Sequence, residues 1–505
     1  MTGGRTFARN SAFNLLGMLL PLLLAVVAMP ALVRGLGADR FGILTLAWAA
    51  IGYFNLFELG LSRALTQAVA HRIGNNRNGE LPAIVWTALL LLLTLGVIGA
   101  VVLAAATPTL IVRVLNVPVD LRQEAIVSFY ILAASLPFVV TTAGLRGLME
   151  AHQHFGATMA LRIPLLAFML IGPLLVLPFS RSLVPAVLML ALGRIIAWGS
   201  HLVVCLRRYE YLREVSPTLH AASMGPLLRF GGWTTVTNTV SPIMAYLDRF
   251  LIGALLPMAA VAHYVTPYEV VTKLTIIPAA VLGAMFPALA ATFSSDRDHM
   301  IHLYDRALRT VVLLIFPVLL VAIALAHEGM RVWMGNAVPP VSAVVLQWLA
   351  LGVFTNSIAQ APFVALQSAG RPDQIAKLHM LELPLYAVSI WLLAKTFGLV
   401  GVAIAWTLRV TIDAVALMLV ARRTLQLPLV PQLGSAWMLP LMVVALVIAA
   451  VPMTTFMKLV YVVIIGGMFV ATAWRGLLSA QERDALLSWI RSPRTVPVET
   501  SEGLA

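Results

Sequence analysis

Four basic side chains lie within stretches of sequence that are otherwise almost entirely apolar: Arg194, Arg249, Lys273 and Arg409. In a lipid bilayer, a charge that faces lipid near the centre costs about 2.5–3.5 kcal/mol, so each would have to face protein or a watery cavity. A guanidinium presents a planar fork to phosphate oxygens and an ammonium a mobile point charge, so cations in such a cavity suit a pyrophosphate. Polar and aromatic neighbours such as Asn55 and Tyr268 would suit a sugar.

Carboxylates near these cations leave a structural role open. Glu269 and Lys273 lie four residues apart, as do Arg409 and Asp413. On a helix, that spacing places the two side chains on one face, where they can form an ion pair that only makes a buried charge tolerable. Arg194 has no acidic residue in its own apolar stretch. It either faces the substrate or makes a contact that holds the helices of its own lobe together.

Two further carboxylates have less obvious partners. Asp248 and Arg249 are adjacent and point in different directions, so each needs some other partner. Glu58, near Asn55, could be a coupling carboxylate that takes a proton or a cation. It could equally be a helix-end residue paired with a neighbouring part of the protein.

These residues are set in about fourteen apolar stretches that run from Phe13 to Trp474. Hydrophobic residues make up 60% of the chain and charged residues 11%, and the mean hydropathy of +0.94 exceeds what a soluble domain of 505 residues could bury. Each stretch matches the ~20 helical residues that cross a bilayer. The long stretch at 260–293 is expected either to extend beyond the membrane or to bend at Pro278 and Pro287. The predicted spans are 13–33, 41–62, 82–106, 125–145, 163–178, 183–205, 230–255, 260–293, 307–326, 342–366, 380–396, 400–421, 435–452 and 459–474.

The net charge of +13 would suit nucleic acid, but the positions of the basic residues argue against that partner. Most of them fall in one alternate set of polar segments, which includes Arg72, Arg77, Arg213 and Arg422. By the positive-inside rule both termini are cytoplasmic, and the surplus charge also contacts anionic lipid headgroups. The single cysteine, Cys205, excludes an intramolecular disulfide and a cysteine-based metal site, and no cofactor is expected.

The second part of the chain repeats the pattern of the first. Arg207-Arg208 and Arg422-Arg423 each close an apolar stretch, and the spacing between these two pairs equals the spacing between Arg194 and Arg409. The predicted fold is an all-α polytopic membrane protein with six-helix lobes at 1–215 and 216–430. Two extra helices lie within 431–475 and a cytoplasmic tail at 476–505. Because six is even, the lobes are parallel repeats, which can rock around a central cavity in alternating access.

Six segments are similar to Wzx-type oligosaccharide flippases, within the multidrug/oligosaccharidyl-lipid/polysaccharide exporters. The resemblance covers about residues 10–425 and is carried by LGADRFGIL (36–44), FELGLSRA (57–64), YLDRFLIG (246–253), AHY (262–264), FPA (286–288) and FGLVGVA (397–403). It implies transfer of a polyprenyl-pyrophosphate-linked oligosaccharide from the cytoplasmic to the periplasmic leaflet of a bacterial inner membrane. It also implies that the spans carrying Arg249 and Lys273 line the cavity, and that a polysaccharide polymerase and chain-length machinery are candidate partners.

Other functions fit less well. A cation-coupled multidrug exporter of the same architecture would be expected to carry a carboxylate in its first span, and residues 13–33 contain none. A peptidoglycan-precursor flippase and a non-transport scaffold of a polysaccharide assembly complex stay open. An enzyme is not expected, because the longest outward loop, 107–124, is too short for an independent active site. The sequence also lacks H-E-x-x-H and G-x-x-x-x-G-K-[ST] motifs.

Overall fold

The computed structural model describes residues 24–53, 58, 60–220, 224–225, 243–292, 297–427, 437–477 and 483–484. These residues form helices and no strand. Within them, nine helical segments are long and apolar enough to cross a membrane, and shorter apolar helices occur at Leu24–Leu36 and Met438–Ala449. The predicted all-α polytopic fold is therefore confirmed. The count of fourteen spans stays a prediction, because parts of spans 13–33 and 230–255 lie outside the described residues.

The helices that carry the argument follow the apolar stretches closely. A helix over residues 243–255 precedes α10. The others are α2 (Ala38–Tyr53), α3 (Leu61–Gly74), α4 (Leu81–Thr109), α5 (Arg122–Ala151), α6 (Phe155–Val176), α7 (Leu183–Arg208), α8 (Tyr211–Glu214), α10 (Met258–Val271), α11 (Ile276–Thr292), α12 (Arg297–Ala324), α13 (Ala326–Met334), α14 (Val341–Ser368), α15 (Pro372–Leu425), α16 (Met438–Ala449) and α17 (Thr455–Thr472).

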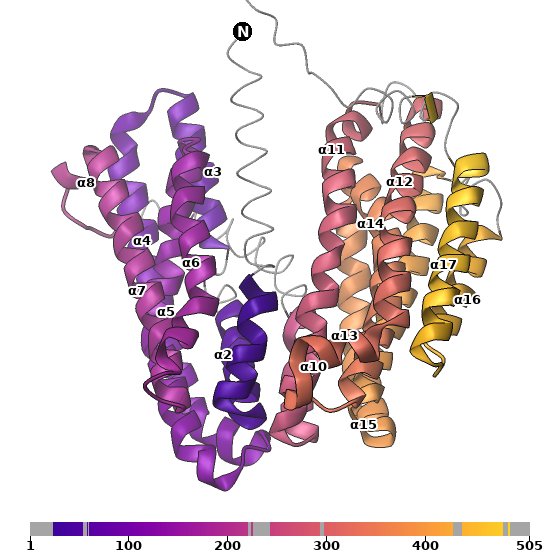
Figure 1. The fold of residues 1–505 in the computed structure, drawn as a ribbon. Coiled ribbons are helices and arrows are strands. Elements are labelled where there is room, and N and C mark those ends of the chain that lie inside the picture. Colours follow the sequence, from indigo (N-terminus) through magenta and orange to yellow (C-terminus); the bar gives the residue numbers. More distant parts are fainter. Residues whose placement is uncertain are drawn as a thin grey trace, which may run out of the picture.

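The helices are divided into two groups along the chain. The first comprises Leu24–Leu36 and α2–α8, and the second comprises the helix over 243–255 and α10–α15, with α16 and α17 outside α12 (Figure 1). Corresponding helices of the two groups are separated by similar distances along the chain. The distance from the start of α4 to the start of α12 is almost the same as that from the start of α6 to the start of α15. The groups approach each other at the end where α2 packs on α10, and their ribbons separate toward the end that carries α3 and the top of α11.

Close contacts join the two groups at the end where they meet. A Cβ added to Gly42 in α2 would lie 2.5 Å from the carbonyl oxygen of Met258 in α10. Asn116 donates from its backbone N to the Gly253 carbonyl oxygen at 2.8 Å, and Trp333 donates from Nε1 to the Val26 carbonyl oxygen at 2.6 Å. Each of these contacts involves a main-chain carbonyl oxygen.

The expected bend in the stretch 260–293 lies elsewhere. A 3₁₀ segment at Thr272–Thr275 separates α10 from α11, and α11 continues as one helix through both Pro278 and Pro287. Pro278 falls in the first turn of α11, where its missing N–H costs little. The prolines therefore do not mark the bend themselves, and the break precedes the first of them.

The predicted spans 380–396 and 400–421 form the two arms of α15, which meet at a sharp turn. Gly398 has φ 59° and ψ −135° there, a conformation that only glycine adopts readily. A Cβ on Gly401 would lie 1.9 Å from the carbonyl oxygen of Leu393. The two glycines of the FGLVG segment therefore allow the arms to turn back closely on one another.

Candidate functional site

A cavity of about 700 Å³ lies within the second group of helices. Its wall combines aromatic rings with amides and charged groups from α10, α14 and α15. Among the predicted site residues, it includes Tyr268, Arg409 and Asp413. The polar and aromatic residues that sequence reasoning did not select are Thr272, Thr275, Asn356, Gln360, Phe363, Gln367, His379 and Trp406.

Arg249 lies beside this cavity and is held there by an ion pair and two aromatic rings. Its side chain is 4% exposed and donates from Nη2 to Oε1 of Glu269 at 2.5 Å. The guanidinium also lies 5.3 Å from the ring centroid of Tyr246 and 5.2 Å from that of Tyr268, within the range of cation–π attraction. The partner that Arg249 was expected to need is therefore Glu269, on the following helix.

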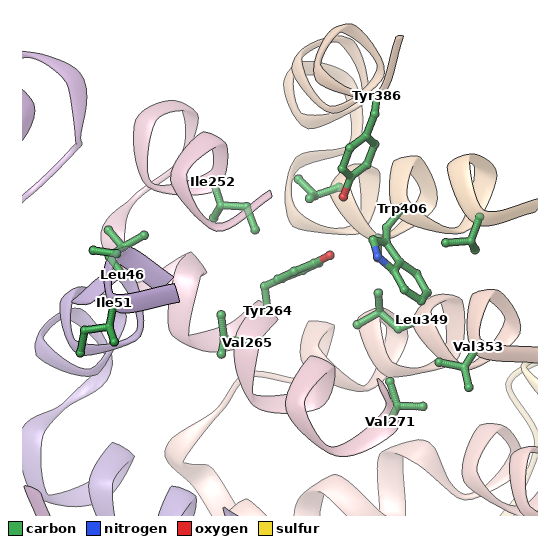
Figure 2. Packing of buried hydrophobic residues seen from close by; sticks show 14 of the residues in the cluster. Leu46, Ile51, Ile252, Tyr264, Val265, Val271, Leu349, Val353, Tyr386 and Trp406 are labelled. Carbon is green, nitrogen blue, oxygen red and sulfur yellow. The ribbon is translucent and has the colours of Figure 1, made fainter. Parts of the chain in front are cut away.

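Asp248 is a buried carboxylate next to Arg249. It is 1% exposed, and it accepts hydrogen bonds from the Tyr264 hydroxyl at 2.9 Å and from the Arg249 backbone N at 2.7 Å. Figure 2 shows Tyr264 among the buried side chains, with Tyr386 and Trp406 directing their polar ends toward the same space. Asp248 thus positions this aromatic cluster and the backbone that carries Arg249.

Lys273 is the accessible cation of the cluster. It lies in the 3₁₀ segment next to Thr272, which lines the cavity, and its side chain is 47% exposed. Its Nζ is 3.3 Å from Oε2 of Glu269, so the pair expected from the four-residue spacing is present. Glu269 therefore bridges a buried cation and an exposed one, and the cluster of these three residues keeps a net charge of +1.

Arg409 and Asp413 do not form the pair that their spacing suggested. The Arg409 guanidinium lies 5.2 Å from the ring centroid of Tyr386, and Asp413 Oδ1 lies 3.5 Å from Nε2 of His379. Both new partners belong to the first arm of α15. The sharp turn in α15 brings that arm beside the second one, and its side chains replace the local partner.

A three-residue cluster at the cavity wall was missed by sequence reasoning. His379, Glu382 and Asp413 each place one possible ligand atom within 4.8 Å of the others. Glu382 is 5% exposed, and neither of its carboxylate oxygens has a hydrogen-bond partner among the described residues. Such a cluster could hold a shared proton or a small cation. The available signal was the i, i+3 spacing of His379 and Glu382 at the start of an apolar stretch.

The remaining predicted residues lie away from this cavity. Arg194, in α7, donates from Nη2 to Sδ of Met169 at 2.8 Å in the first helix group. Glu58 has a buried Oε2 without a hydrogen-bond partner among the described residues, and Asn55 lies outside them. The structure therefore unites Asp248, Arg249, Tyr268, Glu269, Lys273, Arg409 and Asp413 in one region, and separates Arg194 and Glu58 from it.

Two groups of apolar helices with buried charges and a polar cavity define a polytopic membrane protein of the transporter type. The chain belongs to the polysaccharide biosynthesis protein family, whose sequence model matches residues 7–293. It is 29% identical over 413 residues to a Shigella flexneri protein named for O-antigen transport, covering 81% of this chain and 96% of that one. It is 25% identical over 397 residues to the lipopolysaccharide biosynthesis protein WzxC of Escherichia coli (strain K12), covering 76% and 74%.

Solved structures show the same fold. The lipid II flippase MurJ in an inward closed conformation matches with a TM-score of 0.70 at 14% identity, over 92% of this chain and 98% of that one. An inward-facing multidrug resistance transporter of the MATE family matches with a TM-score of 0.68 at 16% identity, over 80% and 94%. The family match and these folds confirm the resemblance that the sequence segments indicated.

Proposed function

We propose that this protein is a flippase that moves polyprenyl-pyrophosphate-linked oligosaccharide from the cytoplasmic to the periplasmic leaflet for surface polysaccharide synthesis. The observation that carries the proposal is the cation cluster at the cavity, in which Glu269 holds Arg249 and Lys273 together. The family and the two named relatives support the same substrate class. The protein acts as a transporter and not as an enzyme.

Lys273 is the group that meets the pyrophosphate. It is the more exposed member of the cluster, and its contact with Glu269 is weak enough for a phosphate oxygen to replace it. Arg249 stays bound to Glu269 and contributes positive potential without leaving its tyrosines. Sugar rings stack on Tyr268 and Trp406, while the amides of Asn356 and Gln360 bind hydroxyl groups along the same wall.

The carboxylates of the second helix group couple transport to an energy source by binding and releasing a proton or a cation. Glu382 and Asp413, with His379, form a place where a proton or small cation can bind and leave as the cavity changes its exposure. Asp413 lines the cavity, so binding of a proton or a cation to this carboxylate changes the charge at the substrate site. Glu58 is a second candidate, in the first group.

The proposed setting is the bacterial inner membrane, with both termini in the cytoplasm and lobes divided near residues 215 and 430. Membrane lipids surround the protein, and a polysaccharide polymerase and chain-length machinery act with it. Single cysteines at Asn75, Ser216 or Thr424, in a Cys205→Ser background, should resist an impermeant thiol reagent added outside intact cells. Labelling of all three would overturn the orientation.

The decisive experiment measures translocation of fluorescent lipid-linked oligosaccharide in proteoliposomes, normalised to folded protein. Lys273→Gln should slow translocation at least about tenfold, which corresponds to about 1.4 kcal/mol of lost interaction. Lys377→Gln is the matched control, because Lys377 is also paired with a carboxylate four residues away, Asp373 at 3.6 Å, but is 68% exposed at the start of α15. Equal rates for both variants would remove Lys273 from the site, and no translocation by the wild-type chain would overturn the function.

A further inference from the structure

A second, smaller pocket lies between α5, α6 and α7 in the first helix group. Its volume is about 70 Å³, and Arg146, Arg162 and Arg194 line it, one from each helix, together with His201. A space of this size has room for about two water molecules. It therefore fits a carboxylate or a single phosphate group and excludes a sugar ring.

The pocket has little negative charge of its own. Arg146 Nε is 3.7 Å from Oε1 of Glu150, and both side chains are 39% exposed. Arg194 has a sulfur atom as its partner, Met169 Sδ, while its Nε is buried without a hydrogen bond. Among the described residues, the ion pairs include none for Arg162 or Arg194. His201 Nδ1 donates a hydrogen bond to the Ala197 carbonyl oxygen. A histidine ring carries no negative charge, so it does not neutralise the arginines.

Comparison with the second half of the chain shows which charged residues the first half lacks. At the spacing that relates Arg207 to Arg422, Arg162 and Arg194 correspond to Lys377 and Arg409, so the cations are present in both halves. The second half also has carboxylates close to these cations. Lys377 pairs with Asp373 at 3.6 Å, and Glu382 and Asp413 lie near Arg409, one helical turn or less from the cavity wall.

The first half lacks those carboxylates. The positions equivalent to Asp373, Glu382 and Asp413 are Thr158, Ala167 and Trp198. Cations thus occupy equivalent places in both halves, while all three positions equivalent to the acids are uncharged in α6 and α7. Arg146 has Glu150 as a partner and Glu58 nearby, but Arg194 lies in the middle of a predicted span and has no carboxylate partner among the described residues. An unpaired charge there is costly, so an external anion would stabilise Arg194.

We infer that this pocket binds an oxyanion of the transported molecule, a phosphate or a carboxylate, as a second anion subsite separate from Lys273. The inference rests on the proposed function only for the source of the anion, since anion binding itself can be measured without transport. Three guanidiniums that converge from three helices can give an oxyanion several charge-assisted hydrogen bonds. The source is either the pyrophosphate of the lipid carrier or an acidic sugar.

The pocket can be tested by anion binding to the purified full chain. All measurements use a Lys273→Gln background, which removes the exposed cation next to the larger cavity and leaves Arg409 in its wall. Inorganic pyrophosphate and glucuronate are titrated by calorimetry at low salt. Arg194→Gln should weaken binding at least tenfold, whereas Arg181→Gln, at an exposed position outside the pocket, should leave it unchanged.

A second pair of variants keeps every arginine in place. Leu165→Glu places a carboxylate on the wall of the pocket, and Leu165→Gln is its uncharged match in size. The glutamate should occupy the pocket as an internal counter-ion and weaken anion binding tenfold, and the glutamine should not. Equal binding by these two variants, equal binding by the two arginine variants, or no anion binding in the Lys273→Gln background would each overturn the inference.

Transport then identifies the source of the anion. Lipid-linked oligosaccharides with and without a uronic acid are compared in proteoliposomes that contain Arg194→Gln or the wild-type chain. Slower transport of both substrates assigns the pocket to the pyrophosphate. Slower transport of the acidic substrate alone assigns it to the glycan. Unchanged transport of both would show that the pocket does not serve the transported molecule.

Discussion

Glu269 is the residue on which the cation cluster depends, and Glu269→Gln should be the most destabilising single change in it. The carboxylate bonds Arg249, which is almost fully buried, and Lys273, which is half exposed. The variant leaves the buried Arg249 guanidinium without its hydrogen-bonded carboxylate, and Asp248 is the acidic residue that remains near it. Such a break costs about 3–5 kcal/mol in the free energy of unfolding.

The two cations should contribute very different shares of that loss. An ion pair as exposed as Lys273 with Glu269 is worth about 0–1 kcal/mol, so Lys273→Met should destabilise the protein by less than about 1 kcal/mol. The double variant Glu269→Gln, Lys273→Met should stay as unstable as Glu269→Gln alone, because Arg249 is still unpaired. Glu269→Gln combined with Arg249→Met should recover part of the loss, since both members of the ion pair are then uncharged, while the buried Asp248 loses the nearby guanidinium.

Equilibrium unfolding of the purified chain in mixed micelles gives these free energies directly. The double variants form two mutant cycles that separate the Arg249 pair from the Lys273 pair. The reasoning is refuted if Glu269→Gln and Lys273→Met differ by less than about 1 kcal/mol. Water in the cavity would then solvate Arg249 well enough to replace its carboxylate.

Two further changes test other parts of the fold. Gly42→Ala should cost about 1–3 kcal/mol, because its new Cβ would lie 2.5 Å from the Met258 carbonyl oxygen, whereas Gly79→Ala, with nothing within 4 Å, is the neutral control in the same unfolding assay. Outside the spans, burial alone would raise the pKa of Glu328 in α13. The hydrogen bond from Lys458 Nζ at 2.9 Å, a backbone hydrogen bond, the charge of Lys458 and the hydrogen bond from Thr455 together outweigh burial and hold the pKa below its usual range. The contact therefore stabilises the fold above the ordinary glutamate pKa of about 4.3 and is lost as pH falls through the lower folded value. Glu328→Gln should remove that acid-side loss of stability, and an unchanged pH profile would contradict this.

The sequence was sufficient for those features that depend on local spacing. Apolar stretches located the helices, and the four-residue spacing of Glu269 and Lys273 identified a pair that is present. The same rule was wrong for Arg409 and Asp413. A spacing of four brings two side chains within reach, but a neighbouring helix can supply better partners, and the turn at Gly398 supplies them here.

Tertiary partners could not be predicted from spacing. Arg249 and Glu269 are on different helices, and His379 and Asp413 lie far apart in sequence, on opposite arms of α15. Which side chains meet in these cases depends on the angle between helices and on the glycines that allow close approach. Sequence reasoning identified the buried charges as important, because their cost in a membrane is general, but it could not assign their partners.

The placement of the charged pairs suits a protein whose two halves move against each other. Arg249 and Lys273 find their carboxylate within the second helix group, and Arg40 of α2 pairs with Glu124 of α5 within the first, at 3.0 Å. The contacts between the groups are instead hydrogen bonds to main-chain carbonyls, from Asn116 and Trp333.

Each neutral hydrogen bond of this kind is worth about 0.5–1.5 kcal/mol, so a few of them together are comparable to one buried ion pair. Among the described residues, separation of the groups would break such hydrogen bonds and the packing of side chains across the groups. It would leave the ion pairs of Arg249, Lys273 and Arg40 intact. About 5.5 kcal/mol of differential binding moves a two-state equilibrium from 1:99 to 99:1. An anion held by cations in both groups could supply a difference of that order, whereas a closure built on buried ion pairs between the groups would be harder to open.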